Sequence, residues 1–243
     1  MRGDAIIHNG ADVSFLKPYS SLKKFNVGST SELIRLSAPC RIPLHFISSA
    51  GVAGFVPPEL LPLKEISVAA YPPTEGGVNG YQAAKWVSER LLEAASEKYR
   101  MKVVIHRPTG IIGEHASNTD IIANFLRYSR AISAAPDMDN WSGYLDLVDV
   151  EVVASTISSL TTQDDDGAQP SVTYIHECND ESFPIQEIGR YLEMEDKNPF
   201  EILPMAEWID RAGKAGMNEM VCMYLKKTSS QGVGNYPRIS SRR

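Results

Sequence analysis

The chain has 243 residues, of which 43% are apolar and 22% charged, a composition typical of a folded globular domain and not of a disordered or fibrous chain. Its 24 basic and 30 acidic side chains give a formal net charge of −6, which argues against a broad surface for nucleic acid. No apolar run reaches the roughly 18 residues of a membrane span, and residues 1–15 lack the pattern of a signal peptide. We therefore expect a cytoplasmic protein that binds neither nucleic acid nor membrane.

The first part of the chain alternates between short apolar strands and helices. Strands are predicted at 5–8, 42–47 and 102–106, and helices at 19–37 and 81–99. The helix at 81–99 has the clearest amphipathic pattern, in which Glu89 and Glu93 are expected to face water. This alternation predicts an α/β fold: a parallel sheet with right-handed crossovers and helices on both faces.

The second part of the chain has a looser pattern of helices and strands. The elements expected there are helices at 119–132, 150–160, 184–192 and 205–214 and strands at 172–177 and 200–203. The predicted organisation is a core over 1–160, a small C-terminal α/β subdomain over 161–228, and a mobile tail over 229–243, where Gly, Pro, Ser and Arg leave little to bury.

Cysteine and histidine do not form a metal-binding pattern. The three cysteines, Cys40, Cys178 and Cys222, are far apart and contain no C-x-x-C pair, so they are expected to be buried apolar residues. Three histidines, which lie on or at the end of apolar strands, have no neighbouring ligands at metal-binding spacing; they are His8, His45 and His106. We predict no metal site.

Tyr81 and Lys85 lie one turn apart at the start of the strongest predicted helix, on the same face. The same Tyr-x-x-x-Lys spacing occurs at Tyr19, where it has no such context. The strand before the helix ends in Ser48 and Ser49, so a hydroxyl and the Tyr–Lys pair are expected at the carboxyl edge of the sheet, where open parallel sheets bind ligands.

This trio suits proton transfer at a carbonyl group. A free tyrosine has a pKa of about 10, and a cation one turn away is expected to lower that pKa toward the range of a general acid or base. A serine hydroxyl beside the phenol can hold the carbonyl oxygen on which negative charge grows during reduction. We therefore predict that Tyr81, Lys85 and a serine of the pair Ser48 and Ser49 are the catalytic residues.

Several motifs, in their order and spacing, resemble the extended short-chain dehydrogenase/reductases. More narrowly, the chain is similar to the thioester reductase domains that end nonribosomal peptide and hybrid polyketide–peptide synthetases. The motifs are His-Asn-Gly-Ala at 8–11, Asn-Val at 26–27, Phe-Ile-Ser-Ser at 46–49, Gly-Tyr-Gln-Ala-Ala-Lys-Trp at 80–86, Arg-Pro-Thr-Gly-Ile-Ile-Gly at 107–113 and Asp-Leu-Val-Asp-Val at 146–150.

The resemblance implies a partial, truncated Rossmann-like core over 1–160 and a subdomain on the substrate side over 161–228. It also implies that Ser49, the second serine of the pair, forms the catalytic trio with Tyr81 and Lys85.

The resemblance also implies roles for further residues. Lys85 would also reach the nicotinamide ribose, Gly10 and Ala11 would pass close to the cofactor, and Pro108 would lie beside the nicotinamide. Asn26 matches an asparagine of the family, which we interpret as mainly structural. The cofactor implied is NADP, and the implied partner is a phosphopantetheine carrier protein that bears an acyl thioester.

One part of the family pattern has no counterpart in this sequence. The glycine-rich turn between a strand and a helix, which holds the pyrophosphate, is not found among the 17 glycines, so the chain is read as starting at the fourth strand of the family sheet. The strand at 5–8 would then have an open edge, and we expect a companion chain or an oligomer to cover it.

Three functions remain open from the sequence. The first is reduction of a carrier-bound acyl thioester with NADPH. The second is a redox-silent, Dieckmann-type cyclisation in which the Tyr81–Lys85 pair moves protons. The third is a non-catalytic remnant that binds a carrier protein.

Overall fold

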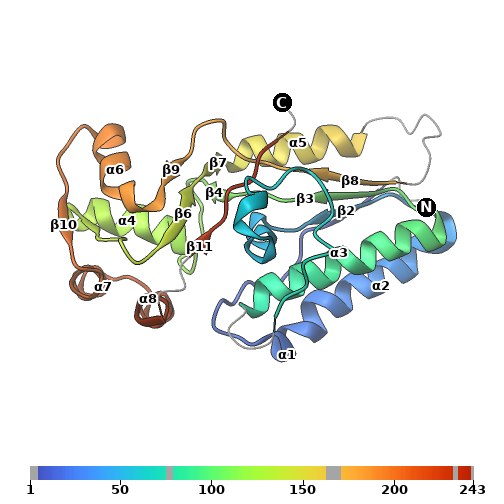
Figure 1. Cartoon of the computed structure of the whole chain (residues 1–243), viewed down its shortest axis with the longest axis horizontal. Helices are drawn as coiled ribbons and strands as arrows, with labels where there is room; N and C mark the ends of the chain where they lie inside the picture. The colour runs from blue at the N-terminus through green and yellow to red at the C-terminus, as the bar shows by residue number, and fades with distance from the viewer. Residues whose placement is uncertain (1–4, 75–78, 163–170, 232–234, 242–243) are drawn as a thin grey trace. The chain divides into compact units, whose positions relative to one another are not determined.

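The computed structural model describes residues 5–74, 79–162, 171–231 and 235–241. The chain divides into two compact units, each built from segments that are separate in sequence (Figure 1). Unit 1 comprises Met1–Thr109, Glu151–Cys178 and Arg238–Arg243, and unit 2 comprises Gly110–Val150 and Asn179–Pro237.

Unit 1 contains a four-stranded parallel sheet in the order β1-β2-β3-β8. Its strands are β1 (Ile6–His8), β2 (Leu44–Ile47), β3 (Val103–His106) and β8 (Val172–Ile175). The central strands β2 and β3 are buried along their whole length, as expected for parallel strands that are covered on both faces.

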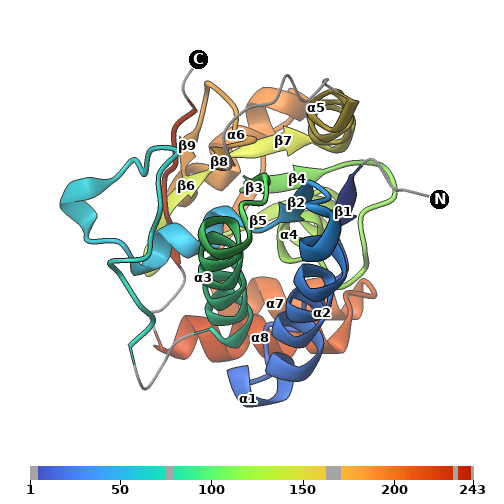
Figure 2. The same ribbon diagram turned by 90° about the vertical axis from the view of Figure 1, so that its right-hand side faces the viewer.

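Helices cover both faces of this sheet. One face carries α1 (Tyr19–Leu22), a π-helical turn (Lys23–Val27), α2 (Gly28–Ser37) and α3 (Gly80–Tyr99), and the opposite face carries α5 (Val150–Thr162), as Figures 1 and 2 show. The Asn79 side chain caps α3 by accepting from the amides of Tyr81 (2.9 Å) and Gln82 (3.4 Å). The helix ends at Arg100, which has a positive φ of 58°.

The main core of unit 1 lies between the sheet and the helices α2 and α3. Its buried members are Ile34, Leu44, Phe46, Leu92, Ala95, Met101, Val103 and Ile105. A second cluster packs the turn after β2 against the described end of the chain, where Leu63 forms an isolated bridge with Ile239. The sheet and its helices therefore hold β2, β3 and α3 in a fixed arrangement.

Unit 2 is built from small sheets and four helices among its described residues. Its helices are α4 (Ile121–Ile132), α6 (Ile188–Asp196), α7 (Met205–Lys214) and α8 (Glu219–Gln231). Its strands are β4 (Gly110–Ile112), β5 (Ala134–Pro136), β6 (Ser142–Leu145), β7 (Leu147–Asp149), β9 (Phe183–Pro184), β10 (Glu201–Leu203) and β11 (Asn235–Tyr236). Trp208 is fully buried, and its indole donates to the Ala134 carbonyl at 3.0 Å.

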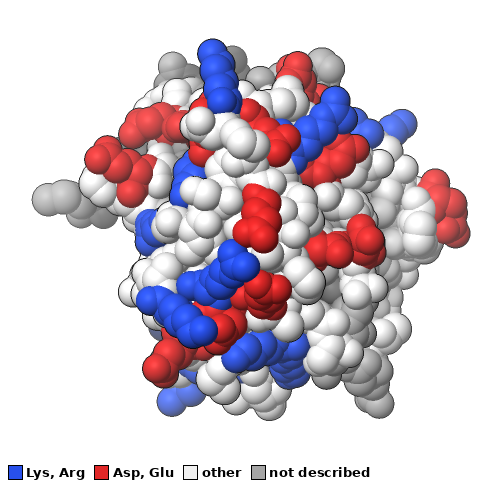
Figure 3. Space-filling model, turned by 90° about the vertical axis from the view of Figure 1, so that its left-hand side faces the viewer, with Lys and Arg blue, Asp and Glu red and all other residues white. Residues whose placement is uncertain are grey.

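Acidic and basic side chains are interleaved on the face shown in Figure 3 and do not gather into one patch of a single sign. Exposed ion pairs of unit 2 join Arg211 to Glu201 (3.0 Å) and Glu207 (2.7 Å), and Lys214 to Asp210 (2.6 Å). Among the described residues, no helix combines the length and the apolar character that crossing a membrane requires.

The structure confirms the predicted α/β class, with a parallel sheet and helices on both faces. The domain boundaries differ from those expected. The predicted boundary at 160 separates β8 from the sheet to which it belongs, and in the predicted tail 229–243, Ile239 is buried and β11 pairs with β6. The segment over 163–170 lies outside the described residues.

Two further expectations differ from the structure. Helix α8 was not expected, because residues 219–231 mix Met, Lys, Thr and Ser with little apolar periodicity. The cysteines were expected to be buried, but Cys40 is exposed and Cys178 and Cys222 are half-buried. Cys40 lies in the short 3₁₀ turn after α2, between two prolines, where no element covers it.

Candidate functional site

Ser49 occupies a fixed position immediately after β2. The parallel ladder continues past the strand end, because Ser48 donates its amide to the His106 carbonyl (2.7 Å) and Ala50 to the Pro108 carbonyl (2.9 Å). The Ser49 hydroxyl accepts from the Gly51 amide at 3.1 Å and so caps the 3₁₀ helix Ala50–Phe55. The backbone and the side chain of Ser49 are therefore both held in place.

Tyr81 lies in the first turn of α3, beside the loop that follows β1. A Cβ atom at Gly80 would lie 2.5 Å from the backbone of Lys17 and of Tyr19, so only glycine allows this close approach. The ring of Phe15, from the same loop, meets the Tyr81 ring edge-on with centroids 5.9 Å apart. The loop after β1 thus packs against the start of α3 and half-buries Tyr81.

Lys85 is buried one turn further along α3, with 3% of its surface exposed. Its ammonium donates to the Ile47 carbonyl at the end of β2. The same ammonium lies 4.7 Å from the centroid of the Phe46 ring and 5.6 Å from that of the Tyr81 ring. The cation is therefore held between the strand end and the tyrosine.

The turn that contains Ser49 also contacts α3. A Cβ atom at Gly51 would lie 2.9 Å from the Gln82 side-chain nitrogen and 3.3 Å from the Ser49 hydroxyl. The strand end 47–51 and the first turns of α3 are thus in direct contact, and the segments that carry the three predicted residues come together at the carboxyl edge of β2.

The pKa of Tyr81 does not follow the sequence-based expectation. Burial raises the pKa of Tyr81 to about 12, so the phenol is neutral at physiological pH. Desolvation of the phenol is the cause of this shift, and it outweighs the lowering that was expected from Lys85. Burial also lowers the pKa of Lys85 to about 8, while the nearby carboxylate of Glu89 acts in the opposite direction.

Asn26 has the structural role that was expected. Its side chain accepts from the Asp12 amide (2.8 Å) and donates to the Asp12 carbonyl (2.9 Å), so both polar groups of one backbone residue are bound. The Asp12 carboxylate pairs with Lys17 at 2.7 Å. Asn26 therefore fastens the loop that packs against Tyr81.

The expected strand histidines are all buried. His8 contacts the Thr30 hydroxyl (3.1 Å), and His45, His106 and Glu177 form a hydrogen-bonded row with contacts of 3.1 and 2.6 Å. Among the described residues, no group of His, Cys, Asp or Glu has the arrangement of a metal site.

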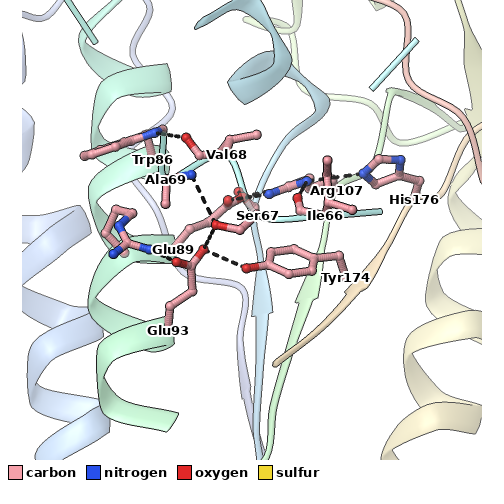
Figure 4. Close-up of polar contacts among 12 residues, drawn as sticks. Ile66, Ser67, Val68, Ala69, Trp86, Glu89, Glu93, Arg107, Tyr174 and His176 are labelled. Atoms are coloured by element: carbon pink, nitrogen blue, oxygen red, sulfur yellow. Dashed lines mark hydrogen bonds and ion pairs between the residues drawn. The ribbon is translucent and has the colours of Figure 1, made fainter. Parts of the chain in front are cut away.

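A buried ion pair, one helical turn beyond Lys85, was not predicted from the sequence. Glu89, expected to face water, is fully buried and pairs with Arg107 at 2.7 Å (Figure 4). The signal that was available is spacing, because Tyr81, Lys85 and Glu89 follow one another at intervals of one helical turn and therefore share a face.

The residues assigned to the cofactor by resemblance differ in their surroundings. Gly10 is exposed, and a Cβ atom there would meet open space, whereas Pro108 is buried where β3 ends. Ala11 is half-buried at the start of the loop after β1. The assignment of Gly10, Ala11, Lys85 and Pro108 to the nicotinamide–ribose end of a dinucleotide therefore stays a prediction from the resemblance.

Comparison with known families assigns the chain. Residues 2–157, more than half of the chain, match the NAD-binding family described as "Male sterility protein". The chain belongs to this family. The match includes the segments of unit 1 that carry Ser49, Tyr81 and Lys85.

The curated relatives are much longer proteins. The hybrid PKS-NRPS synthetase gkaA of Penicillium citrinum is 42% identical over 232 residues, which is 95% of this chain and 6% of that protein. The chain thus spans only a small part of the length of this relative.

Solved structures agree with the same assignment. The terminal R domain from the myxalamid PKS-NRPS biosynthetic pathway is 29% identical with a TM-score of 0.71, and the match covers 98% of this chain and 60% of that one. RMD from Pseudomonas aeruginosa, solved in complex with NADPH, shares the fold at 21% identity with a TM-score of 0.62 over 94% of this chain and 81% of that one. The predicted resemblance to thioester reductase domains of the short-chain dehydrogenase/reductase type is confirmed.

Proposed function

We propose that Ser49, Tyr81 and Lys85 form the substrate-side part of a thioester reductase site that uses NADPH and takes an acyl thioester from a phosphopantetheine carrier protein. The observation that carries this proposal is the direct contact between the strand end after β2 and the first turns of α3, with a buried ammonium between them. The choice of a carrier-bound thioester is supported by the resemblance to terminal reductase domains.

Tyr81 acts as the proton donor. With a pKa of about 12 it carries its proton at neutral pH and can pass it to the carbonyl oxygen as negative charge grows there. The Ser49 hydroxyl accepts from the Gly51 amide, which leaves its own proton free for donation to the same carbonyl oxygen.

Lys85 stabilises the negative charge. Its pKa of about 8 keeps the ammonium charged at neutral pH, and its position over the Tyr81 ring favours the phenolate that forms when Tyr81 gives up its proton. NADPH, when bound, supplies the hydride. One hydride and one proton convert the thioester into an aldehyde and a free thiol, and Tyr81 is reprotonated from solvent.

The neutral phenol also bears on the Dieckmann-type alternative. Cyclisation requires a base that removes a proton from carbon, and a tyrosine whose pKa is raised by burial is a poor base at neutral pH. The proton-donor role therefore agrees better with reduction than with cyclisation.

The experiment follows the near-ultraviolet absorbance of NADPH with this chain and an acyl-pantetheine thioester. We expect Tyr81→Phe to lower the rate by about 10²- to 10⁴-fold, the usual contribution of a general acid. Tyr19→Phe is the matched control, because Tyr19 heads the other Tyr-x-x-x-Lys sequence, and it should leave the rate unchanged. Product release without NADPH, or equal rates for the two variants, would overturn the proposal.

A further inference from the structure

Helix α3 carries a buried acid that the proposed reaction does not use. Glu89 is fully buried and lies one turn beyond Lys85 on the same face of the helix. Burial of a carboxylate costs free energy unless the charge is paired and its oxygens are bound. Its contacts therefore indicate what this position does.

Both oxygens of the Glu89 carboxylate are bound. Oε1 accepts from the Ser48 hydroxyl at 2.5 Å and from Arg107 Nε at 3.0 Å, and Oε2 accepts from an Arg107 terminal nitrogen at 2.7 Å. The two contacts from Arg107 form a bidentate pair, which fixes the orientation of the carboxylate as well as its charge.

Arg107 is itself held at several points, as Figure 4 shows. It donates to the Ile66 carbonyl at 2.8 Å, lies 3.4 Å from His176, and stacks 4.6 Å above the ring centroid of Tyr174. Tyr174 lies in β8, His176 directly follows β8, and Ile66 lies in the segment between Ser49 and Tyr81. The guanidinium thus anchors Glu89 to several parts of unit 1.

Side chains from two successive turns of α3 form hydrogen bonds with two successive residues at the end of β2. Lys85 binds the Ile47 carbonyl, Glu89 binds the Ser48 hydroxyl, and Ser49 is the next residue. We propose that Glu89, oriented by Arg107, is a positioning residue that clamps the end of β2 to α3 and thereby sets where Ser49 and the Lys85 ammonium lie. The consequence for catalysis rests on the function proposed above, whereas the clamp itself does not.

The Glu89 carboxylate also acts on the charge of Lys85. The Glu89 carboxylate raises the pKa of Lys85 against the lowering by burial. The other groups around the ammonium are the Ile47 carbonyl and the rings of Phe46 and Tyr81, together with His8 of β1, whose own pKa is lowered by burial and by Lys85. Glu89 is therefore the carboxylate that keeps Lys85 charged.

The first test measures the pKa of Lys85 directly, by NMR titration of the full chain labelled at the lysine side chains, with Lys85→Arg used to assign the signal. We expect Glu89→Gln to move the pKa of Lys85 below its value of about 8. Glu93→Gln is the matched control, because Glu93 lies one turn further along α3 and binds Tyr174 and Ser67 instead. An unchanged Lys85 pKa in Glu89→Gln, or equal shifts in both variants, would overturn the proposal.

A second variant guards against misfolding, since Glu89→Gln leaves Arg107 buried without its partner. Glu89→Gln combined with Arg107→Met removes both charges together. Because these two charges act on the pKa of Lys85 in opposite directions, the double variant is compared by kcat in the thioester assay, where it should stay at least tenfold below an active wild type. A folded double variant with wild-type kcat would show that the proposal is wrong.

A kinetic readout separates this proposal from the proposed function. In the thioester assay, Glu89→Gln should lower kcat at least tenfold with little change in KM, because the clamp positions reacting groups and does not bind substrate. If the Lys85 pKa shifts while neither protein consumes NADPH, the clamp stands and the proposed function fails. A Glu89→Gln protein with wild-type kcat and an active parent would remove the positioning role.

Discussion

Lys85 is a charged side chain in a buried position, and burial disfavours its charged form. The ammonium has one hydrogen-bond acceptor, the Ile47 carbonyl, two aromatic rings and the Glu89 carboxylate around it, in place of bulk water. Burial of a charge with incomplete compensation lowers stability, and proteins tolerate this mainly where function requires it.

Replacement of Lys85 by Met should therefore stabilise the fold at neutral pH by up to about 3 kcal/mol while abolishing activity, since each unit of pKa shift corresponds to about 1.4 kcal/mol. Because the folded pKa of about 8 lies below the ordinary value of 10.5, the cost of the charge is fully present below pH 8 and fades as pH rises toward 10.5. Thermal unfolding of both proteins from pH 6 to 10.5 measures this difference. A destabilised Lys85→Met at pH 6 would contradict the account.

Gly80 tests the contact between the loop after β1 and α3. A Cβ atom there would meet backbone atoms of Lys17 and Tyr19 at 2.5 Å, and backbone cannot rotate away as a side chain can. We expect Gly80→Ala to cost about 1–3 kcal/mol in unfolding free energy, measured by urea denaturation. Gly54→Ala is the control, because a Cβ atom at Gly54 meets nothing within 4 Å and should cost far less.

The sequence predicted that Tyr81 and Lys85 lie together, but it predicted neither the burial of Glu89 nor the raised pKa of Tyr81. Spacing along one helix reveals which side chains share a face, and it brought these two together correctly. It does not reveal what packs on that face, so Glu89 was expected in water although Arg107 lies against it from another strand end. The Tyr81 pKa was likewise misjudged, because burial by Phe15 and the loop around it depends on tertiary contacts.

At the scale of elements, a buried side chain from the helical segment before α2 binds the loop after β1. Asn26 sits in the π-helical turn Lys23–Val27, a local distortion that is frequent at functional positions. It binds both backbone groups of Asp12, and so it ties the loop to the helices.

Asn26→Ala should free this loop. Loss of two hydrogen bonds at a buried position is expected to cost about 1–3 kcal/mol, and the Asp12 amide should exchange its hydrogen with solvent faster than in the wild type. Amide exchange followed by NMR gives the local effect, while exchange at the core amide of Ile105 reports global stability. Equal acceleration at Asp12 and Ile105 would mean that Asn26 supports the whole fold and not the loop.

The elements themselves were largely predictable where the pattern is periodic. The strands β1, β2 and β3 and helix α3 appear within a few residues of their expected bounds, because apolar periodicity and turn residues mark them. Helix α8 was missed because exposed Met and Lys residues obscure its buried positions, Val221 and Leu225.

At the scale of the whole molecule, neither unit is a continuous stretch of chain. Unit 1 takes β8 and the described end of the chain from beyond the first part of unit 2. A reading in chain order places boundaries where composition changes, as at 160, and cannot show that a later strand returns to an earlier sheet. The division into units was not predictable for this reason. The fold class was predictable, because it depends only on the alternation of strands and helices along the chain.

Buried side chains in the core of unit 1 should contribute more to the free energy of unfolding than exposed side chains of the same unit. Leu92 of α3 is fully buried against the sheet, and its truncation to Ala should cost about 2–5 kcal/mol. Leu36 of α2 is 58% exposed, and its truncation should cost less than about 1 kcal/mol. Chemical denaturation compares the two leucine variants, and similar losses would contradict the arrangement of the core.

An isotope-transfer measurement tests whether Ser49, Tyr81 and Lys85 serve thioester reduction. NADPH that carries deuterium at the transferable position is incubated with this chain and an acyl-pantetheine thioester, and the released product is analysed by mass spectrometry. We expect an aldehyde that contains one deuterium, formed by the wild type and the Tyr19→Phe control and lost in Tyr81→Phe. Release of an unlabelled or cyclised product at the same rate without NADPH would contradict it.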